Sequence, residues 1–315
     1  MEHPFSRPAE WRDIDKLIGN TPLINISDML GIPGPLYAKC EFMNPTGSHK
    51  VRPYAAMIKE AELTWKLSPS MEVVDYTTGN GAAAMAWLCS LRGYRCTAVM
   101  PDGLPDARYD QTRSYGASII ISDGPGTNVA AARARAEAYV NENPSGRFLL
   151  SQSENHMNAT AFHRLGREVR AQLKKKCNRL TTFVCGFGTG GTLTGTCRVL
   201  HERFPNLRTV GVEVDRSAVL WAERTGLPVP HGFHNVIGFS PGAIAPVMDA
   251  SFVNESALVS EEEAATWTRI IRERTGYWVG TSSGASVAVA ARLLKERPNL
   301  APCLTFLWDV GWKYV

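Results

Sequence analysis

One lysine lies where the chain changes from a turn into a helix, and its amine could act as a nucleophile. The segment reads NPTGSHKVR over residues 44–52, with the lysine at Lys50. N–H groups at a helix start favour a neutral amine, which is the form that imine formation requires. A helix start capped by Thr46 or Ser48, with no reactive group, fits the same residues. A Walker loop does not fit, because the glycine spacing and the residue after the lysine differ.

A glycine-rich segment reads GFGTGGT over residues 186–192, between an expected strand and an expected helix. Glycines permit a tight turn with exposed backbone N–H groups, and the helix start adds positive potential, so an anion is the natural ligand. Gly186, Gly188 and Gly191 also match the glycine pattern of dinucleotide-binding folds, with Glu213 ending the next strand. The segment therefore predicts a phosphate without choosing a cofactor. A glycine loop without any ligand is the alternative.

Two further segments combine small and polar residues before a helix. The first reads TTGNG over residues 77–81, and the second reads GTSSGA over residues 280–285. Hydroxyl groups, an amide and backbone N–H groups suit a carboxylate or a phenolic oxygen as ligand. A capped helix start without a ligand explains either segment equally well.

Strand-like and helix-like segments alternate along the chain, which predicts a parallel α/β architecture that would position these four segments. We expect strands at residues 72–76, 96–100, 118–122, from 148, 181–185, 209–214 and 305–308. We expect helices at residues 81–92, 106–115, 128–143, 193–204, 261–275 and 286–296. Two α/β lobes meet near residue 146, and the strand ends facing a shared cleft would hold the site.

The composition narrows the class of protein. A chain of 315 residues with 44% hydrophobic and 20% charged residues is long enough for two globular domains. The net charge of +4 is spread out, and the run Lys174–Lys176 is typical of a solvated helix face, so nucleic acid is not an expected partner.

The seven cysteines form no CxxC pair, and the histidine spacings match no common metal site. We therefore expect reduced cysteines and no metal. The first residues lack the apolar core of a secretion signal, and the longest apolar run, residues 81–91, is too short to cross a bilayer. A soluble, cytoplasmic protein without a membrane partner is expected.

The order of these segments resembles that of the cysteine synthase (O-acetylserine thiol-lyase) and cystathionine β-synthase family, which are fold type II pyridoxal-phosphate enzymes. The likeness runs from IGNTPL at residues 18–23 to DVGWKY at residues 309–314. It implies a two-lobed α/β fold like that of the tryptophan synthase β-subunit, with parallel sheets flanked by helices. It also implies a large cofactor-binding domain (residues 1–40 and 146–315), a small mobile domain (residues 41–145) and a homodimer.

The resemblance assigns a role to each matching position. Lys50 would hold pyridoxal 5′-phosphate and act as the catalytic residue, Asn80 would contact the pyridoxal 3′ oxygen, and Ser282 would face the ring nitrogen. The phosphate cradle would consist of Gly188, Thr189, Gly190, Gly191 and Thr192. The substrate carboxylate would be bound by Thr77, Thr78, Gly79 and Gln152.

The implied function is β-replacement on an O-activated serine or a related amino acid, through an aminoacrylate. A serine at the ring nitrogen makes the cofactor a weaker electron sink than an aspartate would, which favours elimination over transamination or racemisation. Lys50 would be the general base.

Several residues depart from the family pattern where substrate identity would be set: Val51, Thr78, Gly81 and Ser153 replace aspartate, serine, threonine and phenylalanine. We interpret this as the same chemistry with another amino acid or nucleophile, such as an amine or a bulkier thiol in specialised biosynthesis. Drift within a genuine cysteine synthase is the alternative. A serine or threonine dehydratase is a rival, and a nicotinamide-dependent oxidoreductase and a non-catalytic binding homologue are remoter ones.

Overall fold

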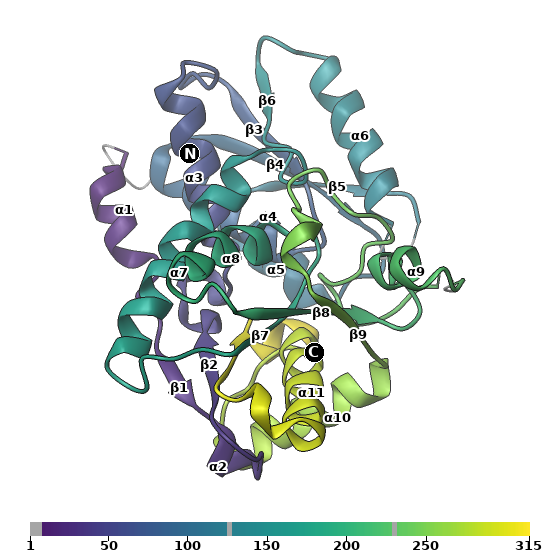
Figure 1. The fold of residues 1–315 in the computed structure, drawn as a ribbon. Helices are drawn as coiled ribbons and strands as arrows, with labels where there is room; N and C mark the ends of the chain where they lie inside the picture. The colour runs from purple at the N-terminus through teal and green to yellow at the C-terminus, as the bar shows by residue number, and fades with distance from the viewer. Residues whose placement is uncertain (1–7, 125–127, 229–231) are drawn as a thin grey trace. The chain divides into compact units, whose positions relative to one another are not determined.

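The structure is a computed structural model that describes residues 8–124, 128–228 and 232–315, and it divides into two compact units (Figure 1). The first unit comprises residues 8–19, Asn44–Asn158 and Lys313–Val315, and the second comprises Asn20–Met43 and Ala159–Trp312.

These boundaries differ from the predicted ones, because residues 8–19, 146–158 and 313–315 belong to the first unit and residues 41–43 to the second. Side chains explain the first difference: Trp11 donates from Nε1 to the Glu62 carboxylate at 2.5 Å, and Lys59 pairs with Asp15 at 2.8 Å. The division into a cofactor-binding domain and a mobile domain stays a prediction.

The first unit is built on a sheet of four parallel strands, in the order β5-β4-β3-β6 among the described residues (Figure 1). Its elements are α1 (Trp11–Leu17), α3 (Val51–Leu63), β3 (Glu72–Tyr76), α4 (Asn80–Arg92), β4 (Arg95–Pro101), α5 (Asp106–Ser114), β5 (Ser118–Ser122), α6 (Val129–Asn141) and β6 (Arg147–Leu149). The chain crosses the sheet in one direction from β3 to β5 and returns to β6. Since such crossovers are right-handed, α4 and α6 cover opposite faces.

Strand β3 shows how the two faces differ. Its side chains alternate in direction, so Val74 and Tyr76 face α6, whose alanines pack against them. Asp75 points to the other face, where the Tyr54 hydroxyl of α3 donates to its carboxylate at 2.7 Å. Around Val74 and Tyr76 the strand therefore faces apolar core, while the opposite face carries the buried Asp75.

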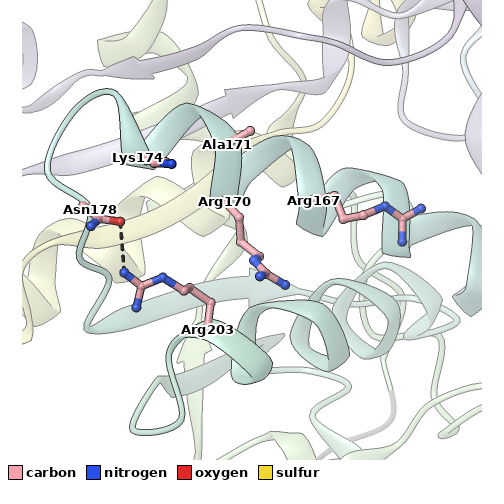
Figure 2. Close-up of a pocket in the computed structure, with 6 residues that line it drawn as sticks. All are labelled: Arg167, Arg170, Ala171, Lys174, Asn178 and Arg203. Carbon is pink, nitrogen blue, oxygen red and sulfur yellow. Dashed lines mark hydrogen bonds between the residues drawn. The ribbon is translucent and has the colours of Figure 1, made fainter.

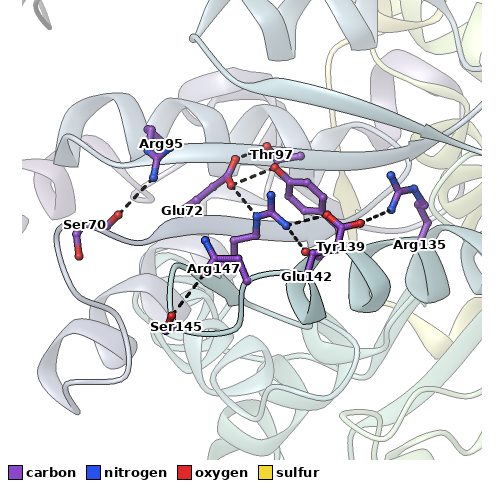
Figure 3. A network of polar contacts seen from close by, with 10 residues as sticks. Ser70, Glu72, Arg95, Thr97, Arg135, Tyr139, Glu142, Ser145 and Arg147 are labelled. Atoms are coloured by element: carbon purple, nitrogen blue, oxygen red, sulfur yellow. Dashed lines mark hydrogen bonds and ion pairs between the residues drawn. The ribbon is translucent and has the colours of Figure 1, made fainter.

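A polar network joins β3, β4, β6 and α6 near the amino ends of the strands (Figure 3). The Glu72 carboxylate accepts from the Thr97 hydroxyl at 2.5 Å and from the Tyr139 hydroxyl at 3.2 Å, and it lies 3.4 Å from Nε of Arg147. The Arg147 guanidinium also stacks on the Tyr139 ring at 3.5 Å from the centroid. This network stabilises the end of the sheet away from residues 77–80 and 150–152, which follow the carboxyl ends of β3 and β6.

The second unit contains a six-stranded sheet, in the order β1-β2-β10-β7-β8-β9 for the part of the chain described. Its pairs are parallel except that of β1 with β2. The elements are β1 (Leu23–Asn25), α2 (Ser27–Leu30), β2 (Leu36–Cys40), α7 (Met157–Lys174), β7 (Thr182–Gly186), α8 (Gly191–Arg203), β8 (Arg208–Val214), α9 (Val219–Thr225), β9 (Glu255–Val259), α10 (Glu261–Thr275), α11 (Thr281–Glu296) and β10 (Cys303–Leu307). Helix α7 begins in the first unit and continues into the second.

Helices α10 and α11 pack at close range because Gly284 has no side chain. A Cβ there would lie 2.1 Å from Oγ1 of Thr268. On the same helix, Ser283 accepts from the backbone N–H of Trp308 and Ser286 accepts from its indole N–H, each at 2.9 Å. Three small residues of α11 thus serve packing and connect the helix to the residue after β10.

The predicted α/β fold class is confirmed, and the predicted elements lie within two residues of their observed ends, with one exception. The helix expected to begin at residue 286 begins at Thr281. Serine and glycine suggested a loop, but here they pack inside a helix. The sequence did not identify α7, β2 or β9. Among the helices described, none combines the length and apolar character that a membrane-spanning segment needs.

Candidate active site

Lys50 is the residue immediately before α3, and its side chain is partly buried. Its Nζ donates to Oε1 of Gln152 at 2.8 Å, which brings two predicted site residues together. Burial lowers the pKa of the Lys50 ammonium to about 8, against an opposing effect of the Asp75 carboxylate. The predicted neutral amine is thus favoured by burial, a cause that the sequence did not reveal.

Asp75 is an acid that the sequence did not identify as part of the site. It is completely buried, and burial raises the pKa of its carboxyl to about 6. The Tyr54 hydroxyl and the backbone N–H of Tyr76, at 3.0 Å, donate to the carboxylate and partly offset that rise. The available signal was Asp75, an acid after two valines in the strand EVVDY and just before the TTGNG segment, whereas Tyr54 carried no signal.

Thr77 packs inside the first unit. It is buried, its backbone N–H donates to the Val99 carbonyl at 3.0 Å, and its hydroxyl donates to the Tyr54 phenol. Both of its donors have partners within the unit and so fix the shape of the loop; the contact of Thr77 with the substrate carboxylate stays a prediction.

Arg108 fixes the next part of the loop. Its guanidinium donates to the Thr78 carbonyl at 2.8 Å and lies 4.6 Å from the centre of the Tyr314 ring. Gly79 has a φ of 121°, and a Cβ there would lie 2.8 Å from Cδ of Arg108. Glycine is therefore required at 79 by both backbone conformation and space. No sequence pattern indicated the role of Arg108.

Asn80 and Gln152 complete the polar groups of the first unit. Asn80 is the first residue of α4, after the glycine N-cap, and its Oδ1 accepts from Nζ of Lys313 at 2.8 Å. Gln152 is buried and donates from Nε2 to the Tyr76 carbonyl at 3.2 Å, which presents its Oε1 to Lys50.

In the second unit, the glycine segment joins β7 to α8 as predicted. Gly190 is the N-cap of α8 with a φ of 78°, and as a glycine it has no side chain that could cap the helix. A Cβ at Gly188 would lie 2.3 Å from the Gly238 carbonyl, and one at Gly190 would lie 2.4 Å from Cβ of Met248. This uncapped, closely covered helix start is suited to an anion such as a phosphate.

Glu213 argues against the dinucleotide interpretation. Its buried carboxylate accepts from the backbone N–H groups of Leu220 and Trp221, each at 2.9 Å, and from the Ser256 hydroxyl. An acid that binds a ribose must be accessible to it. Glu213 instead serves the start of α9.

Ser282 lies buried in the first turn of α11, whose N-cap is Gly280. Its neighbours Ser283 and Ser286 bind Trp308, and Gly284 packs on α10. Within the GTSSGA segment, Ser283 and Gly284 therefore have structural roles. The cofactor role of Ser282 stays a prediction.

A separate cavity of about 530 Å³ lies on the surface of the second unit (Figure 2). It is lined by Arg167, Arg170, Ala171, Lys174, Asn178 and Arg203. Glu202 pairs with Arg170 at 2.8 Å and Asn178 accepts from Arg203 at 3.2 Å. None of the predicted site residues lines it.

The family profile described as pyridoxal-phosphate dependent enzyme matches residues 14–306. The chain belongs to this family. The enzyme is 32% identical over 307 residues to a probable cysteine synthase of Bacillus subtilis, covering 95% of this chain and 94% of the relative. It is 30% identical to cysteine synthases of Staphylococcus aureus, over 96% of this chain and 95% of those proteins.

Solved structures give the same result. An O-acetylserine dependent cystathionine β-synthase from Helicobacter pylori has a TM-score of 0.86 at 29% identity, covering 96% of both chains. O-ureido-L-serine synthase has a TM-score of 0.85 at 30% identity, covering 95% of this chain and 92% of that one. These similarities confirm the predicted family, the cofactor and pyridoxal-phosphate-dependent β-replacement. The residues fit the cofactor, since Lys50 provides an amine of lowered pKa and α8 an uncapped helix start.

Proposed function

We propose that this enzyme replaces the β-substituent of an O-activated serine, or a related amino acid, with a small nucleophile. Lys50 binds the cofactor aldehyde, Asn80 its phenolic oxygen, the loop Gly188–Thr192 its phosphate and Ser282 its ring nitrogen. The substrate carboxylate binds to the loop Thr77–Gly79 and to Gln152. When bound, pyridoxal phosphate withdraws electrons from Cα of the amino acid and so eases loss of its proton.

Lys50 carries the proposal, because its position and its amine match what the chemistry needs. Once released from the cofactor, its Nζ takes the proton from Cα and later returns one to the product. The lowered pKa of about 8 leaves a useful fraction of neutral amine at neutral pH. Gln152 Oε1, at 2.8 Å, accepts a hydrogen bond from the same nitrogen and so orients it.

Ser282 supports replacement over other reactions of amino acids. A neutral hydroxyl stabilises positive charge on the ring nitrogen less than a carboxylate does, so a long-lived carbanion is disfavoured. Departure of a β-substituent then becomes the easier route for the electrons.

One departure from the family pattern, at Gly81, supports a nucleophile other than sulfide. Where the family usually has threonine, this chain has Gly81, and a Cβ there would lie 2.6 Å from the Tyr54 phenol oxygen. The Tyr54 hydroxyl therefore occupies space next to the substrate loop that a threonine would need. O-ureido-L-serine synthase, at 30% identity, is by its name an enzyme that makes a serine derivative other than cysteine.

A product screen tests the proposal. The enzyme loaded with pyridoxal phosphate is mixed with O-acetyl-L-serine and, separately, with sulfide, larger thiols and amines, and products are identified by mass spectrometry. We expect one acetate released per nucleophile captured, with an amine or bulkier thiol preferred. A preference for sulfide would identify a cysteine synthase. Pyruvate and ammonia without any captured nucleophile would contradict the proposal and establish the dehydratase alternative.

The proposal includes a homodimer in the cytoplasm. All seven cysteines are free and all but Cys177 are buried, which suits a reducing compartment. Light scattering on the purified protein measures the mass, and a monomer at micromolar concentration would contradict the dimer.

A further inference from the structure

Lys313 is a buried cation that no step above uses. The residue is only 1% exposed. Its Nζ donates to the Thr46 carbonyl at 2.5 Å and to Oδ1 of Asn80 at 2.8 Å. All three residues belong to the first unit. Burying an ammonium group is costly unless its hydrogen bonds are made. Any movement that breaks one of these two bonds is therefore costly, so Lys313 restrains both Thr46 and Asn80.

The contact with Lys313 decides which way the Asn80 amide points. An ammonium group has donors and no acceptor, so the amide atom that faces it must be the oxygen. The amide nitrogen of Asn80 consequently lies on the other side and is the donor that a ligand meets. A phenolate oxygen is an acceptor and requires that orientation.

The other contact joins Asn80 to the segment that carries Lys50. Thr46 lies in the turn Pro45–Gly47, four residues before Lys50, and has a φ of 61°. Its carbonyl also accepts from Nε2 of Gln111 at 3.2 Å, so the turn keeps one hydrogen bond when Lys313 is removed. In pyridoxal phosphate, the aldehyde carbon and the phenolic oxygen are on adjacent ring atoms. The groups that bind them must therefore keep a fixed separation.

We propose that Lys313 is a positioning residue for the cofactor: it presents the amide nitrogen of Asn80 to the phenolic oxygen and places a positive charge behind that donor. The inference rests on the proposed function, because it needs the cofactor bound through Lys50 and Asn80. Both the donor and the charge favour an ionised phenolic oxygen. They also favour loss of the proton that this oxygen shares with the Lys50 nitrogen.

The test compares Lys313→Met with wild type and with Lys59→Met, which removes a partly exposed lysine from an ion pair in the same unit. Each protein is loaded with pyridoxal phosphate, and the visible absorption band is followed as a function of pH. We expect the pH midpoint of the Lys313→Met band to rise by roughly one unit and its affinity for the cofactor to fall about tenfold or more. Lys59→Met should match wild type.

Asn80→Asp provides a second route if Lys313→Met does not fold. It keeps an acceptor for Lys313 and removes the amide donor, so the band should change in the same direction. In the double variant of Lys313→Met and Asn80→Asp, the shift of the pH midpoint should be smaller than the sum of the two single shifts. A melting temperature that falls in Lys313→Met, with an unchanged band in both single variants, would show a purely structural role and overturn the inference. If wild type does not bind the cofactor at Lys50, the proposed function itself fails, which is seen before any variant is made.

Discussion

Helices α10 and α8 begin in opposite ways, although both belong to the second unit. Helix α10 completes its own start: Oγ of Ser260 accepts from the Glu263 backbone N–H at 3.0 Å, and three glutamates occupy the first turn. Helix α8 has Gly190 as its N-cap and no acid in its first turn. The first arrangement satisfies the N–H groups and the helix dipole from within, while the second lacks such a cap, as expected where an anion is to bind.

The same contrast holds for the other helices that carry predicted site residues. Helices α3, α4 and α11 start at Lys50, Gly79 and Gly280 without a side-chain cap, whereas α6 is capped by Asn128. Some helices without a predicted role, such as α5, also lack a cap. An uncapped start is therefore informative where a glycine in close contact or a buried reactive group accompanies it.

The largest effect is expected for Lys50→Ala, at the start of α3. Loss of the base and of the atom that binds the cofactor should lower turnover by about 10³-fold or more. Steady-state product formation from O-acetyl-L-serine measures it. The melting temperature of the protein without cofactor should not fall, because a buried lysine is costly to keep. A variant that turns over at the wild-type rate would show that Lys50 is not the catalytic residue.

Gly190→Ala separates close contact from backbone strain, and Gly276→Ala is its control. Both glycines have nearly the same φ, 78° and 75°, but a Cβ at 190 would lie 2.4 Å from Met248 whereas one at 276 meets nothing within 4 Å. We expect the free energy of unfolding to fall by about 2–4 kcal/mol for Gly190→Ala and by about 1 kcal/mol for Gly276→Ala.

Urea unfolding of the protein without cofactor measures both changes. Gly190→Ala should also weaken cofactor binding, while Gly276→Ala should not. Equal losses of stability in the two variants would mean that the segment carrying Met248 moves away, and that α8 does not need the glycine for space.

The contrast between helix starts also explains what the sequence could predict. Glycine and threonine next to a strand end made residues 77–81 and 186–192 candidate site segments, because local backbone requirements depend on consecutive residues. Asp75 and Tyr54 were missed because their contact joins β3 to α3 across 21 positions. Arg108 and Lys313 were missed for the same reason, since each acts on a loop distant in sequence.

The fold followed more directly from the sequence. The strand SIIIS at Ser118–Ser122 and the helix at Glu261–Thr275 were located to the residue. The start of α11 was wrong because GTSSGA has a loop-like composition, and only packing on α10 shows why small residues are needed there. Composition reports local preference, whereas close packing between helices depends on tertiary structure.

The pH dependence of cofactor binding tests one helix start separately from the others, because it reflects the pKa of Lys50 at the start of α3. The fold lowers the pKa of the Lys50 cation from 10.5 to about 8, so the neutral amine is gained as the pH rises through 8. At pH 7, about a tenth of Lys50 is then neutral, far more than for an ordinary lysine. The rate of binding to pyridoxal phosphate should rise up to tenfold per unit below pH 8 and level off above it. A rate that continued to rise to pH 10 would contradict the lowered pKa.

The smallest effect is expected for Ser260→Ala, which removes the cap of α10. The Glu263 N–H loses its acceptor, so the free energy of unfolding should fall by about 1 kcal/mol. Turnover, cofactor affinity and the pH dependence of capture should stay at wild-type values, since this helix start serves only the fold. Ser260→Asp, which keeps an acceptor and adds a charge favourable to the helix dipole, should restore the stability. Loss of cofactor affinity in Ser260→Ala would break the distinction between completed and ligand-dependent helix starts.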